Sequence, residues 1–394
     1  MLTVVGGIYL ENCFTPIYSE LFGSALRATC ALGNKGIDIE LKGTVGKEHF
    51  NDLVYKSKLY GFTNSVIESD LKTVEFSYFT PLTKPNIYNL PDKKEHLKVN
   101  ADNILYYGMI ENDCEVVGNY VVYDPQNHIA FTETKSKAQH LAIILNKNEA
   151  QMISKRYDDD LIDIGKQLKK SENAEVVVIK NGAKGAIVFY NDSYEIIPVF
   201  ETHKVWSIGS GDVFSAVFAW KWIVEKLNPI EAAMFASKSV ADFCETQQLP
   251  LVDSNNRHNP IVSKDINRVY IASPFFTVSD KLFVNEIRNL LIEFENEVFS
   301  PMHDLGLLDD KTSKTQMDEA RNRDLLEIEK CDTILAVLSG NDPGTIFEIG
   351  YAIAKGKRVI ILAENYKEAD LFMFKDINCE ITEDFTTAIY KSSW

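Results

Sequence analysis

The stretch Asp324–Lys357, with the sequence DLLEIEKCDTILAVLSGNDPGTIFEIGYAIAKGK, indicates the fold of the carboxy-terminal part of the chain. Its centre is a continuous apolar run, Thr333–Leu338, between two segments with helical patterns. Such a run is typical of a strand that is buried on both faces, and these strands occur in parallel sheets. Ligands of open parallel sheets bind where strands end and helices begin. The loop Asn341–Thr345 is therefore a candidate ligand site.

Glu348 follows this loop by one helical turn and lies among the apolar residues Ile346, Phe347 and Ile349. Taken alone, a glutamate at such a position is more often a carboxylate on a helix surface. Apolar surroundings raise the pKa of a carboxyl group, so a functional Glu348 needs a tyrosine donor or a polar loop to stay ionised. Its interest depends on the residues around it.

The composition bounds the class of protein. With 394 residues, the chain is long enough for two or three domains that each bury a core. The net charge of -16 argues against sequence-independent binding to nucleic acid or to anionic membranes, because both use excess Lys and Arg. The cysteines and histidines show no metal-ligand spacing, and no window suits a signal peptide or a membrane span. We expect a cytoplasmic protein with reduced thiols.

From about residue 121, short apolar runs alternate with helical patterns, which predicts a mostly parallel α/β sheet. Buried strands are expected at 141–145 and 175–179, and a glycine turn after the second leads to a further strand at 186–190. The earlier residues are irregular. Among them, the alternating run Thr73–Thr80 predicts a half-exposed strand of a lid or of an interaction edge.

A second polar loop, Ser207–Asp212, precedes the strongly apolar helical segment Val213–Val224. Free backbone N–H groups and the dipole at a helix N-terminus favour anions, and glycines let a phosphate approach closely. Asp212 repels an anion, so its position suits a base that acts on a hydroxyl beside the phosphate. The loop alone supports equally well an Asp212 that only caps the helix.

The polar, proline-bounded stretch 249–260 has the composition of a linker. A new α/β pattern follows it, with a strand from Arg268 and an amphipathic helix over 280–297. We therefore predict one domain at residues 1–252, a linker at 253–264 and a second domain at 265–394.

The first domain resembles the PfkB family of ribokinase-like sugar and nucleoside kinases. The resemblance rests on Gly209-Ser-Gly-Asp212 followed by Val-Phe, on Asn146-x-x-Glu149 and on the turn Asn181–Gly185. It implies that Asp212 deprotonates an acceptor hydroxyl, and that Asn146 and Glu149 organise magnesium and ATP phosphates, with Glu149 as the metal-binding residue. It also implies that small residues of the two loops bind the nucleotide or the transferring phosphoryl group: Gly182, Gly185, Gly209, Ser210 and Gly211.

Three sites depart from the PfkB pattern. Trp206 and Ser207 stand where the family usually has an acidic or amide residue and a threonine. Glu11 stands in place of a sugar-binding aspartate, and Arg27 in place of an asparagine. We take Glu11 and Arg27 as candidate substrate-binding residues of a rebuilt pocket. A changed acceptor and a kinase fold reduced to a binding or scaffold role both fit these departures.

The second domain resembles the nucleoside 2-deoxyribosyltransferase family and its N-glycoside hydrolase relatives over nearly its whole length. The resemblance rests on Val269–Phe276, on the Asp324 region, on Cys331-Asp332 and on Asp342–Ala352, which reads acid-x-G-T-x-x-E-x-G-x-A.

By this resemblance, Glu348 is the nucleophile that attacks the anomeric carbon, and Tyr270 positions or activates it. Asp324 and Asp342 contact the sugar and the departing base. The neighbouring Gly344 and Thr345 belong to the substrate site. The chemistry agrees, since a carboxylate stabilises or traps an oxocarbenium-like state while a second acid protonates the leaving group. Water as acceptor gives a hydrolase and a second base gives a transferase, and both stay open.

We therefore predict an α/β protein with a ribokinase-like three-layer domain followed by a smaller Rossmann- or flavodoxin-like parallel-sheet domain. The expected activity is N-glycosidic cleavage or deoxyribosyl transfer on nucleosides or nucleotides. ATP and Mg²⁺ are expected only if the kinase-like domain is active, and the second domain needs no cofactor. The alternatives are an ATP-dependent sugar or nucleoside kinase with an accessory carboxy-terminal domain, and a non-catalytic nucleotide sensor. Expected partners are nucleosides, nucleotides or sugars and further copies of the chain, but no nucleic acid and no membrane.

Overall fold

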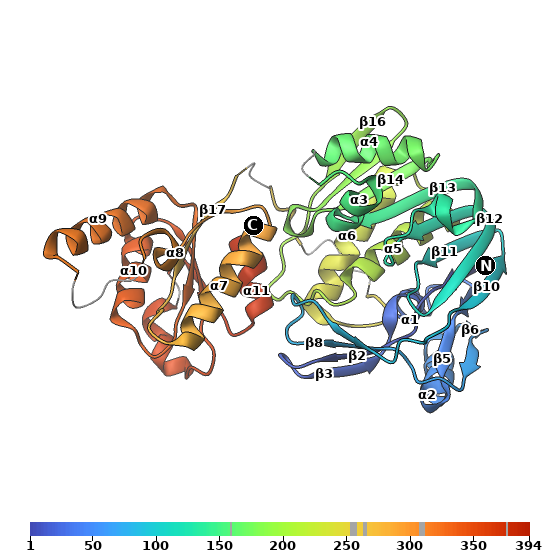
Figure 1. The fold of residues 1–394 in the computed structure, drawn as a ribbon, viewed down its shortest axis with the longest axis horizontal. Helices are drawn as coiled ribbons and strands as arrows, with labels where there is room; N and C mark the ends of the chain where they lie inside the picture. Colours follow the sequence, from blue (N-terminus) through green and yellow to red (C-terminus); the bar gives the residue numbers. More distant parts are fainter. Residues whose placement is uncertain (158–159, 253–257, 263–265, 307–311, 376) are drawn as a thin grey trace. The chain divides into compact units, whose positions relative to one another are not determined.

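The computed structural model describes residues 1–157, 160–252, 258–262, 266–306, 312–375 and 377–394 (Figure 1). The chain divides into two compact units, Met1–Ile261 (unit 1) and Val262–Trp394 (unit 2), and we describe each by itself. Of the predicted linker, residues 253–257 and 263–264 lie outside the described residues. Within the described ranges, no helix is both long enough and apolar enough to cross a membrane.

Unit 1 is built on a large sheet in which the described residues form ten strands. Their order is β16-β15-β14-β13-β12-β11-β1-β4-β6, and β10 pairs with β12. Neighbouring strands are parallel except at the β14-β15-β16 edge, where two antiparallel pairs form. The strands are β1 (Leu2–Val5), β4 (Ile39–Lys42), β6 (Thr63–Asn64), β10 (Glu95–Asn100), β11 (Asn103–Tyr107), β12 (Asn112–Asp124), β13 (Lys137–Asn146), β14 (Val176–Lys180), β15 (Ala186–Tyr190) and β16 (Ser193–Ile197).

Helices cover both faces of this sheet, which makes unit 1 a three-layer structure (Figure 1). Side chains of α1, α5 and α6 join the core on one face, and side chains of α3 and α4 join the core on the other. The helices are α1 (Gly23–Ala31), α2 (Lys47–Tyr60), α3 (Lys147–Ser154), α4 (Leu161–Ser171), α5 (Ser210–Ala219), continued by a π-helical turn (Trp220–Val224), and α6 (Pro229–Thr246), with short 3-10 turns at Phe131–Thr134 and Gly182–Lys184.

A separate small sheet of unit 1 has the order β3-β2-β8-β9. Its strands are β2 (Leu10–Cys13), β3 (Tyr18–Leu21), β8 (Glu75–Tyr78) and β9 (Asn86–Tyr88), and β5 (Thr44–Gly46) pairs separately with β7 (Ile67–Ser69). The alternating run at 73–80 thus contributes β8, and most of β8 is only partly buried.

Unit 2 is a parallel sheet of five strands in the described residues, in the order β18-β17-β19-β20-β21. The strand that comes first along the chain therefore lies second in the sheet, as in flavodoxin-like folds. The predicted buried run forms β19, and all five of its residues are buried. The strands are β17 (Arg268–Ala272), β18 (Glu297–Phe299), β19 (Thr333–Val337), β20 (Arg358–Leu362) and β21 (Cys379–Thr382). The predicted parallel-sheet fold is confirmed.

The helices of unit 2 flank its sheet (Figure 1). The predicted helix at 280–297 is correct in type but ends at Glu293, because Glu297–Phe299 pairs with β17 as a strand. The helices are α7 (Val278–Glu293), α8 (Pro301–Asp304), α9 (Lys314–Lys330), α10 (Pro343–Ala354) and α11 (Phe385–Ser392), with a 3-10 segment at Glu368–Phe374.

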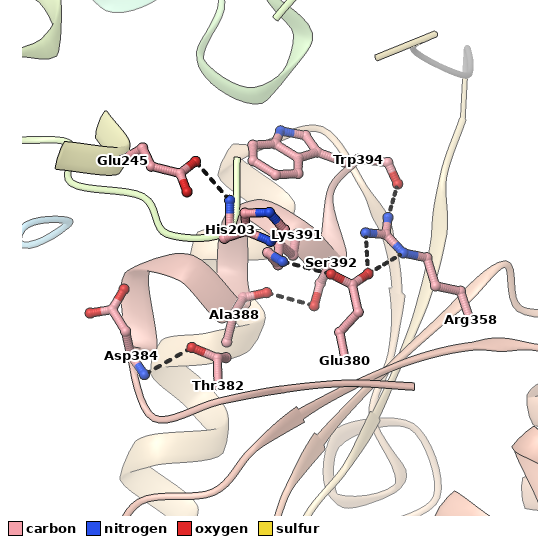
Figure 2. A network of polar contacts seen from close by, with 10 residues as sticks. All are labelled: His203, Glu245, Arg358, Glu380, Thr382, Asp384, Ala388, Lys391, Ser392 and Trp394. Atoms are coloured by element: carbon pink, nitrogen blue, oxygen red, sulfur yellow. Dashed lines mark hydrogen bonds and ion pairs between the residues drawn. The ribbon is translucent and has the colours of Figure 1, made fainter. Parts of the chain in front are cut away.

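A polar network around Glu380 of β21 fixes the end of unit 2 (Figure 2). Glu380 accepts hydrogen bonds from Nη2 of Arg358 at 2.8 Å and from Nζ of Lys391 at 2.6 Å. Nη1 of Arg358 also donates to the backbone oxygen of Trp394 at 2.7 Å. Burial by itself raises the pKa of Glu380, but the hydrogen bonds and ion pairs with Lys391 and Arg358 bring it below its ordinary value. The network therefore ties β20, β21 and α11 together.

Candidate active site

Three side chains of unit 2 meet at the switch point of its sheet, where the strand order reverses between β17 and β19. The hydroxyl of Tyr270 on β17 lies 2.7 Å from Oε1 of Glu348 and 3.4 Å from Oδ1 of Asp324. Glu348 belongs to α10, which follows β19, and Asp324 belongs to α9, which precedes it. The sequence placed these three residues in one site, and the fold brings their side chains into contact.

Burial sets the proton affinities of this cluster. Tyr270 is fully buried, and burial with two adjacent carboxylates raises its pKa far above the ordinary value, so its hydroxyl stays protonated. Burial raises the pKa of Glu348 to about 8, the hydrogen bond with Tyr270 opposes this, and Asp324 and Asp342 raise it further. Burial also raises the pKa of Asp324 to about 6. Between these two values, the two carboxyl groups together hold one proton.

Asp342 forms the N-cap of α10. Its Oδ2 accepts hydrogen bonds from the backbone N–H of Thr345 at 2.7 Å and from the Thr345 hydroxyl at 2.9 Å. Thr345 is buried, so its hydroxyl is engaged inside the protein, whereas Gly344 is exposed in the first turn. The capping bonds fix the start of the helix that carries Glu348. The charge of Asp342 meanwhile acts on the pKa of Glu348.

The arrangement in unit 2 offers groups for nucleophilic and acid-base chemistry. Glu348 supplies a carboxylate, and Asp324 supplies a second carboxyl group for proton transfer. Tyr270 holds a hydroxyl group against both, which fixes the orientation of Glu348.

In unit 1, Asp212 lies in the first turn of α5, directly after a loop in which Gly209 has a φ of 78°. No side chain of the described residues caps α5, so Asp212 does not act as its cap. Oδ1 of Asp212 accepts a hydrogen bond from Nε2 of Gln126 at 2.7 Å. Burial raises the pKa of Asp212 to about 7, while Arg27 lowers it and Glu11 raises it. Gln126 belongs to no motif, so no role was predicted for it from the sequence.

Arg27 of α1 lies beside Asp212 and is almost completely buried. Its guanidinium pairs with Glu11, and its Nε lies 3.7 Å from Oδ2 of Asp212. A side chain at Gly209 would overlap this guanidinium, so the backbone of the loop packs directly on Arg27. Glu11, Arg27 and Asp212 do come together, but they form an internal ion-pair cluster.

A second buried ion pair lies on another side of the same loop. Nζ of Lys180 bonds to Oδ2 of Asp124 at 3.0 Å, and the hydroxyl of Ser215 donates to the same oxygen at 2.7 Å. A side chain at Gly211 would approach Nζ of Lys180 to 3.3 Å. No role was assigned to Lys180 from the sequence. Their proximity could have been predicted from their positions, because Asp124 and Lys180 are the last residues of two parallel strands, β12 and β14, and so lie at the same edge of the sheet.

Asn146 and Glu149 form the capping box of α3. Oδ1 of Asn146 accepts from the backbone N–H of Glu149 at 2.9 Å, and Oε2 of Glu149 accepts from that of Asn146 at 2.7 Å. Burial raises the pKa of Glu149 to about 7. Across the part of the chain that the structure describes, no three acidic, His or Cys side chains converge on a possible metal site. The side chains of Asn146 and Glu149 are both bonded within the capping box, and magnesium binding by Glu149 stays a prediction.

The predicted nucleotide turn is a short 3-10 segment between β14 and β15. Gly182 and Gly185 both have positive φ, and a side chain at Gly185 would overlap the carbonyl oxygen of Ile197. The turn therefore requires glycine at position 185 whether or not a nucleotide binds there. Gly182 faces open space.

Comparison with known families assigns both units. Residues 269–385 match the nucleoside 2-deoxyribosyltransferases, and residues 110–246 match the pfkB family carbohydrate kinases. The chain joins a PfkB kinase domain to a nucleoside 2-deoxyribosyltransferase domain. We call them the kinase domain and the transferase domain. Both resemblances drawn from the sequence are confirmed. A comparison with curated proteins found no match.

The kinase domain is similar in fold to a solved fructokinase of the ribokinase fold, and two further ribokinase-family kinases match less well. A fructokinase double mutant from Vibrio cholerae O395 is 13% identical with a TM-score of 0.52, and the match covers 63% of this chain and 93% of that chain. A nucleoside kinase from Methanocaldococcus jannaschii is 16% identical with a TM-score of 0.46, covering 62% and 91%. A pyrophosphate-dependent kinase of the ribokinase family is 12% identical with a TM-score of 0.47, covering 62% and 95%. At 13% identity, the similarity to the fructokinase shows the fold alone.

Proposed function

We propose that the transferase domain breaks the N-glycosidic bond of a nucleoside or a nucleoside monophosphate, with Glu348 as the nucleophile. The observation that carries this proposal is the 2.7 Å contact between the Tyr270 hydroxyl and Glu348 at the switch point of the sheet. The family match over residues 269–385 supports the same chemistry.

In the proposed first step, a carboxylate oxygen of Glu348 bonds to the anomeric carbon while the bond from that carbon to the base nitrogen breaks. The oxocarbenium-like transition state is stabilised by the negative charge of Glu348. The departing base gains a proton, for which Asp324 is the proposed donor because it is the second carboxyl group beside the Tyr270 hydroxyl and shares one proton with Glu348. Asp342 is proposed to contact the sugar or the base from the start of α10.

In the proposed second step, the ester between the sugar and Glu348 is broken by attack on the anomeric carbon. Attack by water releases the free sugar and completes a hydrolysis. Attack by a second base forms a new nucleoside and completes a transfer. Either route returns Glu348 as a free carboxylate.

Tyr270 has a positioning role in this scheme. Its hydrogen bond lowers the pKa of Glu348 and so opposes the effect of burial. Without this bond, more of the protein would carry a protonated and unreactive Glu348 at neutral pH.

We do not extend the proposal to phosphoryl transfer by the kinase domain. The pKa of Asp212, about 7, suits a general base, but Gln126 and Arg27 lie against its two oxygens. An ATP- and Mg²⁺-dependent kinase stays an alternative proposal, and ATP consumption that needs an added sugar or nucleoside and is abolished by Asp212→Asn would support it. A nucleotide sensor is the other alternative, and tight calorimetric binding without turnover would support that.

A chromatographic scan tests the proposal. Purified full-length protein is incubated with a panel of nucleosides and their 5′-monophosphates, with and without Mg-ATP. We expect release of free base from at least one compound, independent of Mg-ATP. No release from the complete panel, or full activity of Glu348→Ala, would contradict the proposal.

A further inference from the structure

Unit 1 contains an open cavity of about 340 Å³ next to the Arg27 cluster. Its walls come from the start of β3, from α1 and α2, from the loop before α5 and from the segment after α6. Small-molecule sites in proteins typically have volumes of roughly 300–1,000 Å³. The cavity is therefore large enough for a small ligand.

Aromatic side chains form part of the cavity wall, together with polar and charged side chains. Trp206 and Phe243 are buried, and the rings of Tyr18 and Trp206 lie 4.9 Å apart. The five aromatic residues of the wall are Tyr18, Phe22, Tyr60, Trp206 and Phe243. Aromatic faces bind other planar rings by stacking and edge-to-face contact.

The wall also offers polar groups that the protein itself does not use. The hydroxyls of Tyr18 and Tyr60 make no hydrogen bond to any residue that the structure describes. Tyr18 is mostly enclosed, and burial raises its pKa far above the ordinary value, so its hydroxyl is present as a neutral donor. Free donors beside aromatic rings offer a ligand both polar and apolar contacts.

The charges around the cavity are already neutralised. Nζ of Lys56 bonds to Oε2 of Glu20 at 3.1 Å and lies 4.1 Å from the centre of the Phe22 ring. Arg27, the other cation on the wall, is paired with Glu11. No net positive charge is therefore left to attract a phosphate, whereas the Lys56–Glu20 pair presents a donor and an acceptor side by side.

We propose that this cavity binds a neutral planar heteroaromatic ring of the nucleobase type, and that the kinase domain acts as a binding module through it. The ring stacks between the aromatic walls, and its polar edge meets the two tyrosine hydroxyls and the Lys56–Glu20 pair. Arg27 lies against the Asp212 carboxylate, so the proposed ligand lies beside Asp212 and does not contact it. Base released by the transferase domain would be one source of the ligand, but binding does not depend on that activity.

Calorimetric titration of the full chain tests the proposal. The protein carries Glu348→Gln so that no glycosidic bond is cleaved. The probes are adenine, hypoxanthine and thymine at concentrations up to about 1 mM, which suits ligands with a Kd as weak as about 1 mM. We expect at least one base to bind, and the paired change Tyr18→Phe and Tyr60→Phe to weaken binding about tenfold or more while the protein stays folded. Gln248→Trp, which adds bulk at the exposed rim, should block binding. Tyr194→Phe, on the distant β16, is the matched control and should bind as before.

Three results would overturn the proposal. The first is that none of the bases binds, and the second is that binding is unchanged in both cavity variants, which would place the base elsewhere. The third is that the matching nucleoside monophosphate binds through the cavity residues more tightly than the base. Base release by the unaltered protein is measured separately. A failure of the cavity proposal can therefore be told apart from a failure of the proposed function.

Discussion

Tyr270 has a single hydroxyl proton but two carboxyl neighbours. It donates that proton to Glu348 at 2.7 Å, and the longer 3.4 Å contact with Asp324 becomes a good hydrogen bond only if Asp324 moves or carries the proton itself. The hydroxyl therefore links the proposed nucleophile to the proposed acid.

Removing this hydroxyl should change the pH dependence of base release. In Tyr270→Phe, the pKa of Glu348 should rise above about 8, because the hydrogen bond that lowers it is gone. We expect the rate at pH 7 to fall by about 10²-fold and the rising limb of kcat/KM to move to higher pH. Tyr351→Phe is the matched control, since the Tyr351 hydroxyl bonds to Glu329 at 2.6 Å. A Tyr270→Phe profile that coincides with the unaltered protein would contradict the role of Tyr270.

Glu348 should also make stability depend on pH. Its pKa is about 8 in the folded state against an ordinary value of 4.5. A raised pKa adds stability that is fully present below the unfolded value and is lost as pH rises through the folded value. Glu348→Gln removes this dependence, so the variant should be more stable than the parent at pH 8, on the order of 2 kcal/mol, and equal to it near pH 4. Denaturant unfolding of both proteins at pH 4 and pH 8 measures the difference in stability. The same difference at both pH values would contradict the prediction.

At the scale of the elements, α10 links the capping residue to the active-site residue. Asp342 caps the start of the helix and Glu348 lies six residues later, so a change at Asp342 affects both the helix and the charge near Glu348.

Two substitutions separate these effects. Asp342→Ala should lower the free energy of unfolding by about 1 kcal/mol, because the cap is lost. Asp342→Ser should keep most of that stability, because serine also caps helices. Both changes remove the negative charge, so in both the pKa of Glu348 should fall and the rising limb of kcat/KM should move to lower pH. Unfolding curves and pH profiles measure this, and a serine variant as unstable as the alanine variant would contradict the capping role.

The network around Glu380 of β21 should make stability depend on pH in the opposite direction to Glu348. The pKa of Glu380 lies below its ordinary value of 4.5, so the network contributes stability above that pH and loses it as pH falls through the folded value. Because the Glu380 side chain is 36% exposed, we expect Glu380→Gln to cost only about 1 kcal/mol at pH 7 and nothing near pH 3.

Glu297→Gln is the control for that substitution, since its pair with Arg268 is largely exposed and should contribute less. Unfolding experiments on both variants compare the two sites. If the two cost the same, the Glu380 network has no special role.

Strands with continuous apolar runs, such as β19, were predictable because their burial on both faces is visible in the sequence. Helices α1 and α2 were not predicted from the sequence, for opposite reasons. Every residue of α1 is buried, so no polar face marks its period, and in α2 only Leu53 is fully buried, so no apolar face does. The α7 boundary was wrong because the short strand β18 has no pattern of its own.

The candidate site residues were also predictable only in part. Tyr270, Asp324 and Glu348 were expected together because the resemblance to the nucleoside 2-deoxyribosyltransferases implies that they act in one site. The packing of Arg27 on Gly209 was not predictable, since the sequence holds no sign that a distant guanidinium would occupy the open side of a glycine. Gln126 and Lys180 were missed for the same reason, because their partners are distant in sequence.

At the scale of the whole molecule, two enzyme families that act on small molecules are joined in one chain. The net charge of -16 fits small ligands bound at local sites and gives no surface excess of positive charge for nucleic acid. In this account the transferase domain supplies the chemistry and the kinase domain supplies a binding site.

The most direct test of this account is the rate of base release by full-length Glu348→Gln compared with the unaltered protein, on the best substrate of the nucleoside and nucleotide panel. Loss of a nucleophile that forms a covalent intermediate should reduce the rate by about 10³-fold or more while the variant stays folded. A Glu348→Gln rate within about threefold of the unaltered protein, a difference of roughly 0.7 kcal/mol in barrier, would contradict the central role of Glu348.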